Sequence, residues 1–237
     1  MISHKKKIVF VHIPKTGGKC LSEFLFPYCD EESLRFSPFG EISDLHATAA
    51  QYVEHYGLEQ LDGYRFFTIV RNPFDKALSL ALHQNKNVFE REHFRQVIQS
   101  PKEFNLWPHS HAHFLLNKWL WPPELCKMFA KGAEVPVDQI ILDKYPHQPL
   151  RAQFNNMKKM LCPATILRFE NYAQDVSAFF DMCDIKYDMD KLTVKTNTTD
   201  HQHYSQYYEE EEIAEIKYAC GFDLQWLGYK FEKGEQK

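Results

Sequence analysis

The stretch from Lys7 to Phe26 reads KIVFVHIPKTGGKCLSEFLF, and it divides into three parts. The β-branched, apolar run from Lys7 to Ile13 predicts a strand that is buried on both faces. Pro14 ends the strand because it has no N–H to donate, and the pair Gly17-Gly18 permits a sharp turn. The apolar spacing from Lys19 to Phe26 then predicts a helix. The stretch therefore predicts a strand, a loop and a helix in direct succession.

The loop in this stretch has the features of an anion site. Backbone N–H groups at such a turn, together with the N-terminus of the helix that follows, form a cradle for phosphate. Lys15 and Lys19 add positive charge beside it. In a GxxxxGK[ST] loop for nucleoside triphosphates, however, a glycine would replace Ile13 and a hydroxyl would replace Cys20. Because a thiol is a poor ligand for Mg²⁺, we expect a phosphorylated nucleotide other than Mg-ATP, and no metal.

A second stretch, from Tyr64 to Ser79, has the same layout. Tyr64 to Val70 predicts a buried strand, and Pro73 opens a helix at its favoured first-turn position. Arg71 follows the strand at its carboxyl end, where open α/β sheets bind ligands. Ser79 lies two turns into the helix, on a face that can look back towards Arg71. An arginine and a hydroxyl together suit a terminal phosphate.

The remaining pattern predicts further strands and helices in alternation. The expected strands are Gln139–Leu142 and Ala164–Arg168, and the expected helices cover 44–57 (with Asp44 as N-cap), 90–100, 110–121, Asn171–Met182 and Glu209–Cys220. This order predicts an α/β fold with a central parallel sheet flanked by helices. Because no repeat or linker divides the chain, we expect a single domain over residues 1–237.

Composition narrows the class of protein. The chain has 237 residues and 44% hydrophobic content, which suits one sizeable core. Its net charge of -4 gives no global basic field for nucleic acid or an anionic membrane. Six scattered cysteines, without zinc-type spacing, predict reduced thiols. No apolar run approaches the roughly 20 residues of a membrane span, and no signal-peptide core follows Met1. We therefore expect a cytoplasmic protein without membrane association.

The two stretches together resemble the nucleotide site of sulfotransferases that use 3′-phosphoadenosine 5′-phosphosulfate (PAPS). In that family a PKTGG-type loop holds the 5′-phosphosulfate, and an RNPxDRxxS segment holds the 3′-phosphate. Here these segments are Pro14–Gly18 and Arg71–Ser79. The resemblance extends to Leu167–Asn171 and Gly228–Phe231, and it looks closest to the branch of carbohydrate O-sulfotransferases with bacterial relatives. It implies a P-loop-kinase-like sulfotransferase fold.

The resemblance also implies an activity and a set of binding residues. The activity is transfer of a sulfuryl group from PAPS to a hydroxyl of a small molecule or glycan, with a carbohydrate as the expected acceptor and PAP as the product. The implied nucleotide-binding residues are Pro14, Lys15, Thr16, Gly17, Gly18, Lys19, Cys20, Arg71, Ser79, Thr199, His201 and Tyr204. The chain departs from the family where Lys19-Cys20 replaces a Thr-Ser pair, and where Lys76 replaces an arginine.

The catalytic groups are implied in the same way. Lys15 takes the leaving-group role, since an ammonium beside the bridging oxygen stabilises the charge that develops there. His46 matches a histidine that serves as catalytic base in this branch, and imidazole accepts protons near neutral pH. Glu23 stands where some related enzymes keep a catalytic carboxylate. The choice of base between His46 and Glu23 stays open.

Alternative functions remain open from the sequence. One is a nucleotide kinase or NTPase of related architecture, and another is a non-catalytic module that binds PAP or a glycan. The alternating histidines of His109–His113 have no nearby cysteine or carboxylate to complete a metal set, so we expect them at an acceptor pocket or on an exposed helix face. Neither the acceptor nor the oligomeric state is encoded in any pattern.

Overall fold

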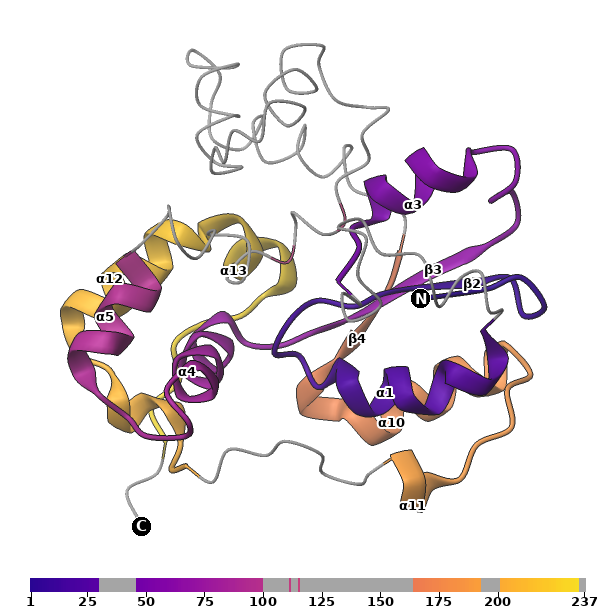
Figure 1. The fold of residues 1–237 in the computed structure, drawn as a ribbon. Helices are drawn as coiled ribbons and strands as arrows, with labels where there is room; N and C mark the ends of the chain where they lie inside the picture. Colours follow the sequence, from indigo (N-terminus) through magenta and orange to yellow (C-terminus); the bar gives the residue numbers. More distant parts are fainter. Residues whose placement is uncertain (30–45, 100–110, 112–114, 116–163, 193–200, 235–237) are drawn as a thin grey trace, which may run out of the picture. The chain divides into compact units, whose positions relative to one another are not determined.

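The computed structural model describes residues 1–29, 46–99, 111, 115, 164–192 and 201–234 (Figure 1). Contacts within the chain group these residues into two compact units, whose segments alternate along the sequence. The first unit holds a β-sheet with its covering helices, and the second is helical. The predicted strand at 139–142, most of the predicted helix at 110–121, and the residues Asp44 and Thr199 lie outside the described residues.

The sheet of the first unit has four strands in the order β1-β2-β3-β4. Their bounds are β1 Ile2–Ser3, β2 Ile8–Val11, β3 Arg65–Val70 and β4 Ala164–Arg168. Strands β2, β3 and β4 run parallel, and β1 pairs antiparallel with β2. The predicted parallel sheet in an α/β fold is therefore confirmed, with one short antiparallel strand added that is too brief to leave a sequence pattern.

The strand register determines which residues meet at the carboxyl edge of the sheet. Val11 lies opposite Thr68, and Val70 lies opposite Arg168. The residues that follow the three parallel strands therefore emerge at one edge, where parallel sheets bind ligands.

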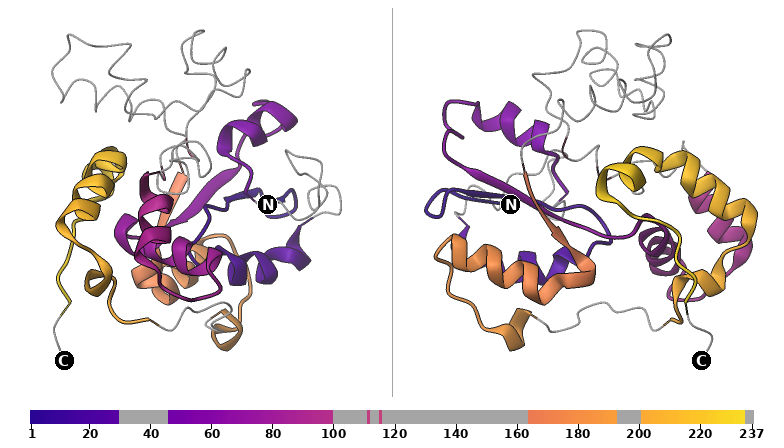
Figure 2. Two further views of the ribbon diagram at one scale, coloured as in Figure 1. Left: turned by 60° about the vertical axis from the view of Figure 1, so that its left-hand side comes forward. Right: turned by 180° about the vertical axis from the view of Figure 1, so that it is seen from behind.

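Both faces of this sheet are covered. On one face, alternate strand residues such as Phe10 and Phe67 pack against α1 (Gly18–Leu25) and α10 (Tyr172–Met182). Helix α3 (Ala49–Tyr56) lies on the opposite face (Figures 1 and 2). Burial on both faces explains the apolar run of β2, which is buried along its whole length, and of β3 beyond Arg65. Three shorter elements complete the unit: η1 (Phe26–Tyr28), η3 (Phe169–Asn171) and α11 (Met189–Leu192).

The start of α3 differs from the prediction. Its N-cap is Thr48, whose side chain accepts from the Gln51 N–H (3.2 Å), while the Gln51 side chain accepts from the Thr48 N–H (2.7 Å). This reciprocal pair is a capping box, which outweighs a single acidic residue further upstream. The prediction of Asp44 as N-cap was therefore wrong, and His46 precedes the helix instead of beginning it. The predicted end at Gly57 is confirmed.

The second unit is built from four α-helices and a short 3₁₀ helix among the residues described. They are α4 Pro73–Gln84, α5 Arg91–Gln99, α12 Glu210–Ala219, α13 Gly221–Leu227 and η4 Tyr204–Tyr207. Their core is aromatic, with Phe74 and Phe94 fully buried against Tyr204 and Ile216. The predicted helices α4, α5 and α12 are confirmed, with Pro73 at the first turn of α4. Helix α13 was not predicted.

Within the described residues, no helix combines the length and the apolar character that a membrane crossing requires.

Candidate functional site

The loop between β2 and α1 has an unusual backbone. Lys15 and Gly17 both have positive φ angles, of 63° and 82°. Gly17 is the N-cap of α1 and has no side chain to cap the helix, and the first turn of α1 contains no acidic residue. The positive end of the helix dipole is thus not neutralised from within this turn, and left-handed residues in the loop turn N–H groups towards a common point. The loop therefore fits an anion such as phosphate or sulfate.

Two close contacts explain the glycine pair. A Cβ on Gly17 would lie 2.8 Å from ring atoms of Phe169, and a Cβ on Gly18 would lie 2.3 Å from the ring of His12. Both distances are far below van der Waals contact, and a left-handed conformation at Gly17 would further penalise a side chain. Each glycine is thus required by a neighbour that approaches the loop backbone.

The other predicted residues of the loop take different places. Thr16 is fully buried, and its hydroxyl donates to the carbonyl oxygen of Ile13 (2.9 Å). This side chain braces the loop, so a contact with an anion would come from its backbone N–H. Pro14 is half-buried, Lys19 is exposed, and Cys20 is half-buried in the first turn of α1. Cys20 and the other three described cysteines form no disulfide.

Arg71 joins the second motif to the loop. It follows β3 as predicted, is buried, and donates from Nη1 to the carbonyl oxygen of Lys15 (3.1 Å). Its guanidinium carbon lies 4.3 Å from the centre of the Phe169 ring. Burial, and secondarily the charge of Arg71, lower the pKa of Lys15 to about 8. Two cations are thus held close together at the carboxyl edge of the sheet, an arrangement that favours a bound anion.

His46 lies beside the same loop. Its Nδ1 is 2.9 Å from the carbonyl oxygen of His12. Because a carbonyl can only accept, Nδ1 carries the hydrogen, and Nε2 is the lone-pair nitrogen of the neutral ring. The ring centre of His46 is 4.5 Å from that of His12. This orientation suits a group that accepts a proton through Nε2.

His12 is a residue of the site that the sequence analysis missed. Its ring is buried, stacks on Phe10 at 5.3 Å, and places Nδ1 3.3 Å from the Ser22 hydroxyl. Burial and the nearby His46 lower its pKa well below the usual range, so the ring is neutral at physiological pH. A polar residue at the end of an otherwise apolar strand was the signal that could have identified it.

Glu23, the competing base, is exposed on α1. The buried face of this helix consists of Gly18, Leu21, Ser22 and Leu25. Glu23 therefore lies off the face that packs against the sheet.

The remaining predicted site residues belong to the second unit. Ser79 is buried in α4. Tyr204 is buried, and its hydroxyl accepts from the Glu232 N–H (2.8 Å) and from the Asn72 side chain (3.3 Å). His201 has Nδ1 2.6 Å from the Gln202 carbonyl oxygen. The structure thus brings together the loop, Arg71 and His46 within the first unit, whereas Ser79, His201 and Tyr204 are placed within the second.

Asn72 is a further residue that the sequence analysis did not single out. Its side-chain oxygen accepts from the Phe74 N–H (3.1 Å), which caps α4. Its side-chain amide donates to the carbonyl oxygen of Lys230 (3.0 Å). Asn72 therefore fixes the start of α4 and holds the tail of the chain.

His111, the alternating histidine that the structure describes, is buried. His111 places Nδ1 3.0 Å from a carboxylate oxygen of Asp223, and both residues are almost completely buried. The expectation of an exposed helix face was therefore wrong for His111, because its carboxylate partner is distant in sequence. No group of three metal-ligating side chains occurs among the residues that the structure describes.

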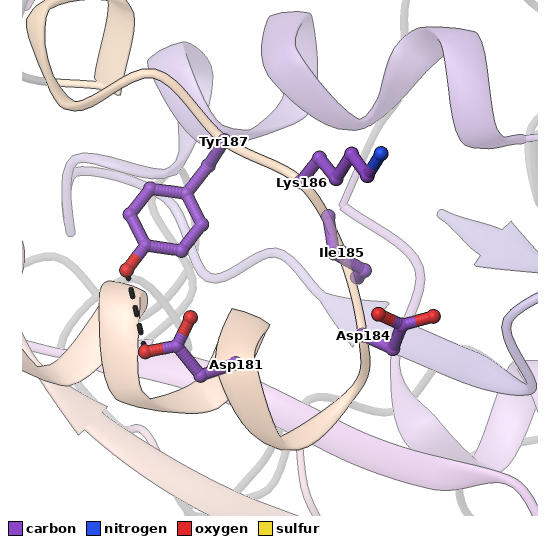
Figure 3. Close-up of a pocket in the computed structure, with 5 residues that line it drawn as sticks. All are labelled: Asp181, Asp184, Ile185, Lys186 and Tyr187. Carbon is purple, nitrogen blue, oxygen red and sulfur yellow. Dashed lines mark hydrogen bonds between the residues drawn. The ribbon is translucent and has the colours of Figure 1, made fainter.

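A pocket outside this site lies at the end of α10. It is lined by Asp181, Asp184, Ile185, Lys186 and Tyr187, and the Tyr187 hydroxyl donates to Asp181 across 3.3 Å (Figure 3). None of these residues belongs to the predicted site.

The chain was also compared with known proteins. The model of a family described as the sulfotransferase family matches residues 1–219. No curated protein and no solved structure showed significant similarity to the chain.

Proposed function

The chain belongs to the sulfotransferase family, and from this premise we propose that it moves a sulfuryl group from PAPS to a hydroxyl of a carbohydrate. The observation that supports PAPS as the donor is the contact between the PKTGG loop and Arg71, the first residue of the second motif. Arg71 donates to the Lys15 carbonyl oxygen, so an anion loop and a second buried cation meet at one sheet edge. A nucleotide with phosphates at both its 5′ and 3′ positions matches two separate cationic motifs.

The residues that would hold the donor follow from this arrangement. The backbone of Lys15–Gly18 and the N-terminus of α1 would bind the 5′-phosphosulfate. Arg71, with Ser79 from the same motif, would bind the 3′-phosphate. Thr199, His201 and Tyr204 stay predictions for the loop that covers the nucleotide.

Lys15 would assist departure of the leaving group. The bound donor supplies an activated sulfuryl group, and its transfer is an in-line displacement similar to phosphoryl transfer. Lys15 belongs to the anion loop, and its ammonium would neutralise the negative charge that grows on the leaving phosphate. A lysine with a pKa of about 8 still carries this charge at neutral pH.

His46 would take the proton of the acceptor hydroxyl. Its Nδ1 lies 2.9 Å from the His12 carbonyl oxygen, so in the neutral ring Nε2 is the nitrogen that would accept the proton. We prefer it to Glu23 because Glu23 is exposed on α1, whereas His46 is fixed against the loop by His12.

The proposal of a carbohydrate acceptor rests on the chain's resemblance to the branch of carbohydrate O-sulfotransferases. The test is transfer of radiolabel from PAPS to a panel of oligosaccharides and phenols, with and without EDTA. We expect labelled oligosaccharide in both conditions. Label only in phenols would refute the acceptor class, and strict dependence on Mg²⁺ with ATP as donor would favour a kinase. PAP binding without transfer to any acceptor would favour a binding module.

A substitution at Lys15 provides the control for this assay. Lys15→Ala should reduce turnover by about 10²- to 10³-fold, the usual cost of removing one charge-stabilising donor. Lys86 is a matched control, because it is an exposed lysine that also has a positive φ (51°) but belongs to the second unit. Lys86→Ala should retain wild-type turnover.

A further inference from the structure

Phe169 touches both motifs of the candidate site, although its ring has no polar group. It follows β4 directly, and the pairing of Val70 with Arg168 brings it next to Arg71 at the carboxyl edge. Its ring lies beneath the Arg71 guanidinium at 4.3 Å, and its edge occupies the space beside Gly17 where a side chain would sit.

The position of Phe169 is itself fixed by the backbone around it. Arg168 is the last residue of β4, and its N–H donates to the carboxylate of Asp175 in α10 (2.7 Å). This bond ties the end of the strand to the helix that follows. Phe169, between them, therefore presents its ring from a rigid support.

The consequence concerns the conformation of Arg71. An arginine side chain has many rotamers, and ordering it on binding costs free energy. Here the ring face attracts the guanidinium on one side, and the Lys15 carbonyl oxygen accepts a hydrogen bond from it. The same hydrogen bond supports Lys15 in its positive-φ conformation. The ring, the guanidinium and the loop thus hold one another in place.

We propose that Phe169 is a positioning residue for the nucleotide: its ring holds Arg71 against the Lys15–Gly17 loop, so that both phosphate-binding motifs are preformed. This inference rests on the proposed function, because it assigns the preformed site to a nucleotide with 3′- and 5′-phosphates. Phe169 acts through Arg71 and need not touch the nucleotide itself.

The test is a double-mutant cycle read by calorimetric titration with PAP. Phe169→Leu keeps an apolar side chain but removes the ring face, and it should weaken PAP binding about tenfold, within the usual range for a cation–π contact. Phe169→Tyr keeps the ring face and should bind as the wild type does. In an Arg71→Gln background, Phe169→Leu should change affinity less than about twofold, because its partner is already gone.

A matched control separates positioning from loss of an aromatic core residue. Phe24 packs in the same hydrophobic core, where its ring stacks on Phe180 at 5.2 Å. Phe24→Leu should therefore leave PAP affinity unchanged. Equal losses from Phe24→Leu and Phe169→Leu, or additive losses from Phe169→Leu and Arg71→Gln, would overturn the proposal while leaving the proposed function intact.

Urea unfolding without nucleotide tests the coupling between Phe169 and Arg71 even if PAP does not bind. The wild type, Phe169→Leu, Arg71→Gln and the double variant would be unfolded in urea without nucleotide. Non-additive changes in the free energy of unfolding would show that the ring holds Arg71 in the free protein, and additive changes would refute it. Failure of the wild type to prefer PAP over ADP would instead refute the proposed function.

Discussion

At the scale of single residues, Lys15 combines a positive-φ backbone with a side-chain charge that is lost at mildly alkaline pH. Its φ is 63°, and the hydrogen bond from Arg71 to its carbonyl oxygen accompanies that conformation. Burial and Arg71 together lower its pKa to about 8. The group that would neutralise the leaving phosphate is therefore charged at neutral pH and loses its proton as pH rises through about 8.

This pKa predicts how PAP affinity depends on pH. As pH rises through about 8, the free protein loses the Lys15 charge, so PAP should bind more weakly and each binding event should take up a proton. Lys15→Arg should remove this dependence, because a guanidinium does not titrate in this range. Calorimetry in buffers of different ionisation enthalpy measures the proton uptake. A dissociation constant that stays flat in the wild type across this range would contradict the assignment.

His46 gives a second prediction at this scale. His46→Ala should reduce turnover by about 10²- to 10⁴-fold, the usual contribution of a general base, while PAP affinity stays within about twofold. Glu23→Gln is the matched comparison and should retain turnover, since Glu23 is exposed on α1. Steady-state kinetics alongside PAP titrations separates the two effects. Wild-type turnover in His46→Ala, with a loss in Glu23→Gln, would move the base to Glu23.

At the scale of elements, Glu212 joins α12 to α5. Its side chain is 1% exposed, accepts from Arg91 and Arg95, and closes a capping box with the Glu209 N–H (2.6 Å). Burial alone would raise the pKa of Glu212, but the hydrogen bonds from Arg95, the Glu209 N–H and Arg91 lower it. The carboxylate thus stabilises the start of α12 and also links α12 to α5.

Glu212→Gln should lower the free energy of unfolding by about 1–3 kcal/mol, since two arginines lose a buried charged partner. Urea unfolding measures the change. Because the folded-state pKa lies below the usual value of 4.5, this contribution is present above that pH and is lost as pH falls through the folded-state pKa. The gap between variant and wild type should therefore close in acid.

Glu211→Gln serves as the control, because Glu211 is 75% exposed and lies 3.7 Å from Arg95. Its effect should stay within about 0.5 kcal/mol, as is usual for exposed ion pairs. Equal changes in the free energy of unfolding from the two substitutions would show that the contribution of Glu212 does not depend on its burial.

The elements show which features were predictable from local sequence. Strand β2 is apolar and buried along its whole length and β3 is buried beyond Arg65, so their apolar runs located them. Strand β4 was recognisable from a shorter apolar run. The cap of α3 depends on a reciprocal bond between Thr48 and Gln51, and an upstream aspartate was wrongly preferred. Strand β1 has two residues, which is too few for any periodicity.

In the candidate site, too, features of the local sequence were predictable and contacts between distant segments were not. The place of the PKTGG loop before α1 and of Arg71 directly after β3 was predictable from the apolar runs beside them, whereas their roles stay predictions. The contacts of Phe169 with Gly17 and Arg71, and of His12 with Gly18, were not predictable. The Phe169 contacts depend on the register of β4 against β3, and that register joins residues about a hundred positions apart.

At the scale of the whole molecule, the two compact units share one interleaved chain. The first unit draws on Met1–Arg71, Phe114–Leu116 and Cys162–Thr198, while the second draws on the rest of the chain. No single cut in the chain would separate them. This interleaving supports our proposal that residues 1–237 form a single domain.

A single domain predicts one cooperative unfolding transition. Far-UV circular dichroism follows the helices, and tryptophan fluorescence follows tertiary packing, so the two signals should give the same urea midpoint. Two separate transitions, or midpoints that differ between the probes, would show that the units unfold independently.

The central claim is that this member of the sulfotransferase family uses PAPS as its donor. The most direct test is a calorimetric titration of the wild-type chain with PAP, and with ADP under the same conditions. The two nucleotides differ in where the second phosphate sits, so the comparison isolates recognition of the 3′-phosphate. We predict that PAP binds at least about tenfold more tightly, the gain expected from a charge-assisted contact with Arg71. Equal affinity for PAP and ADP would contradict the claim.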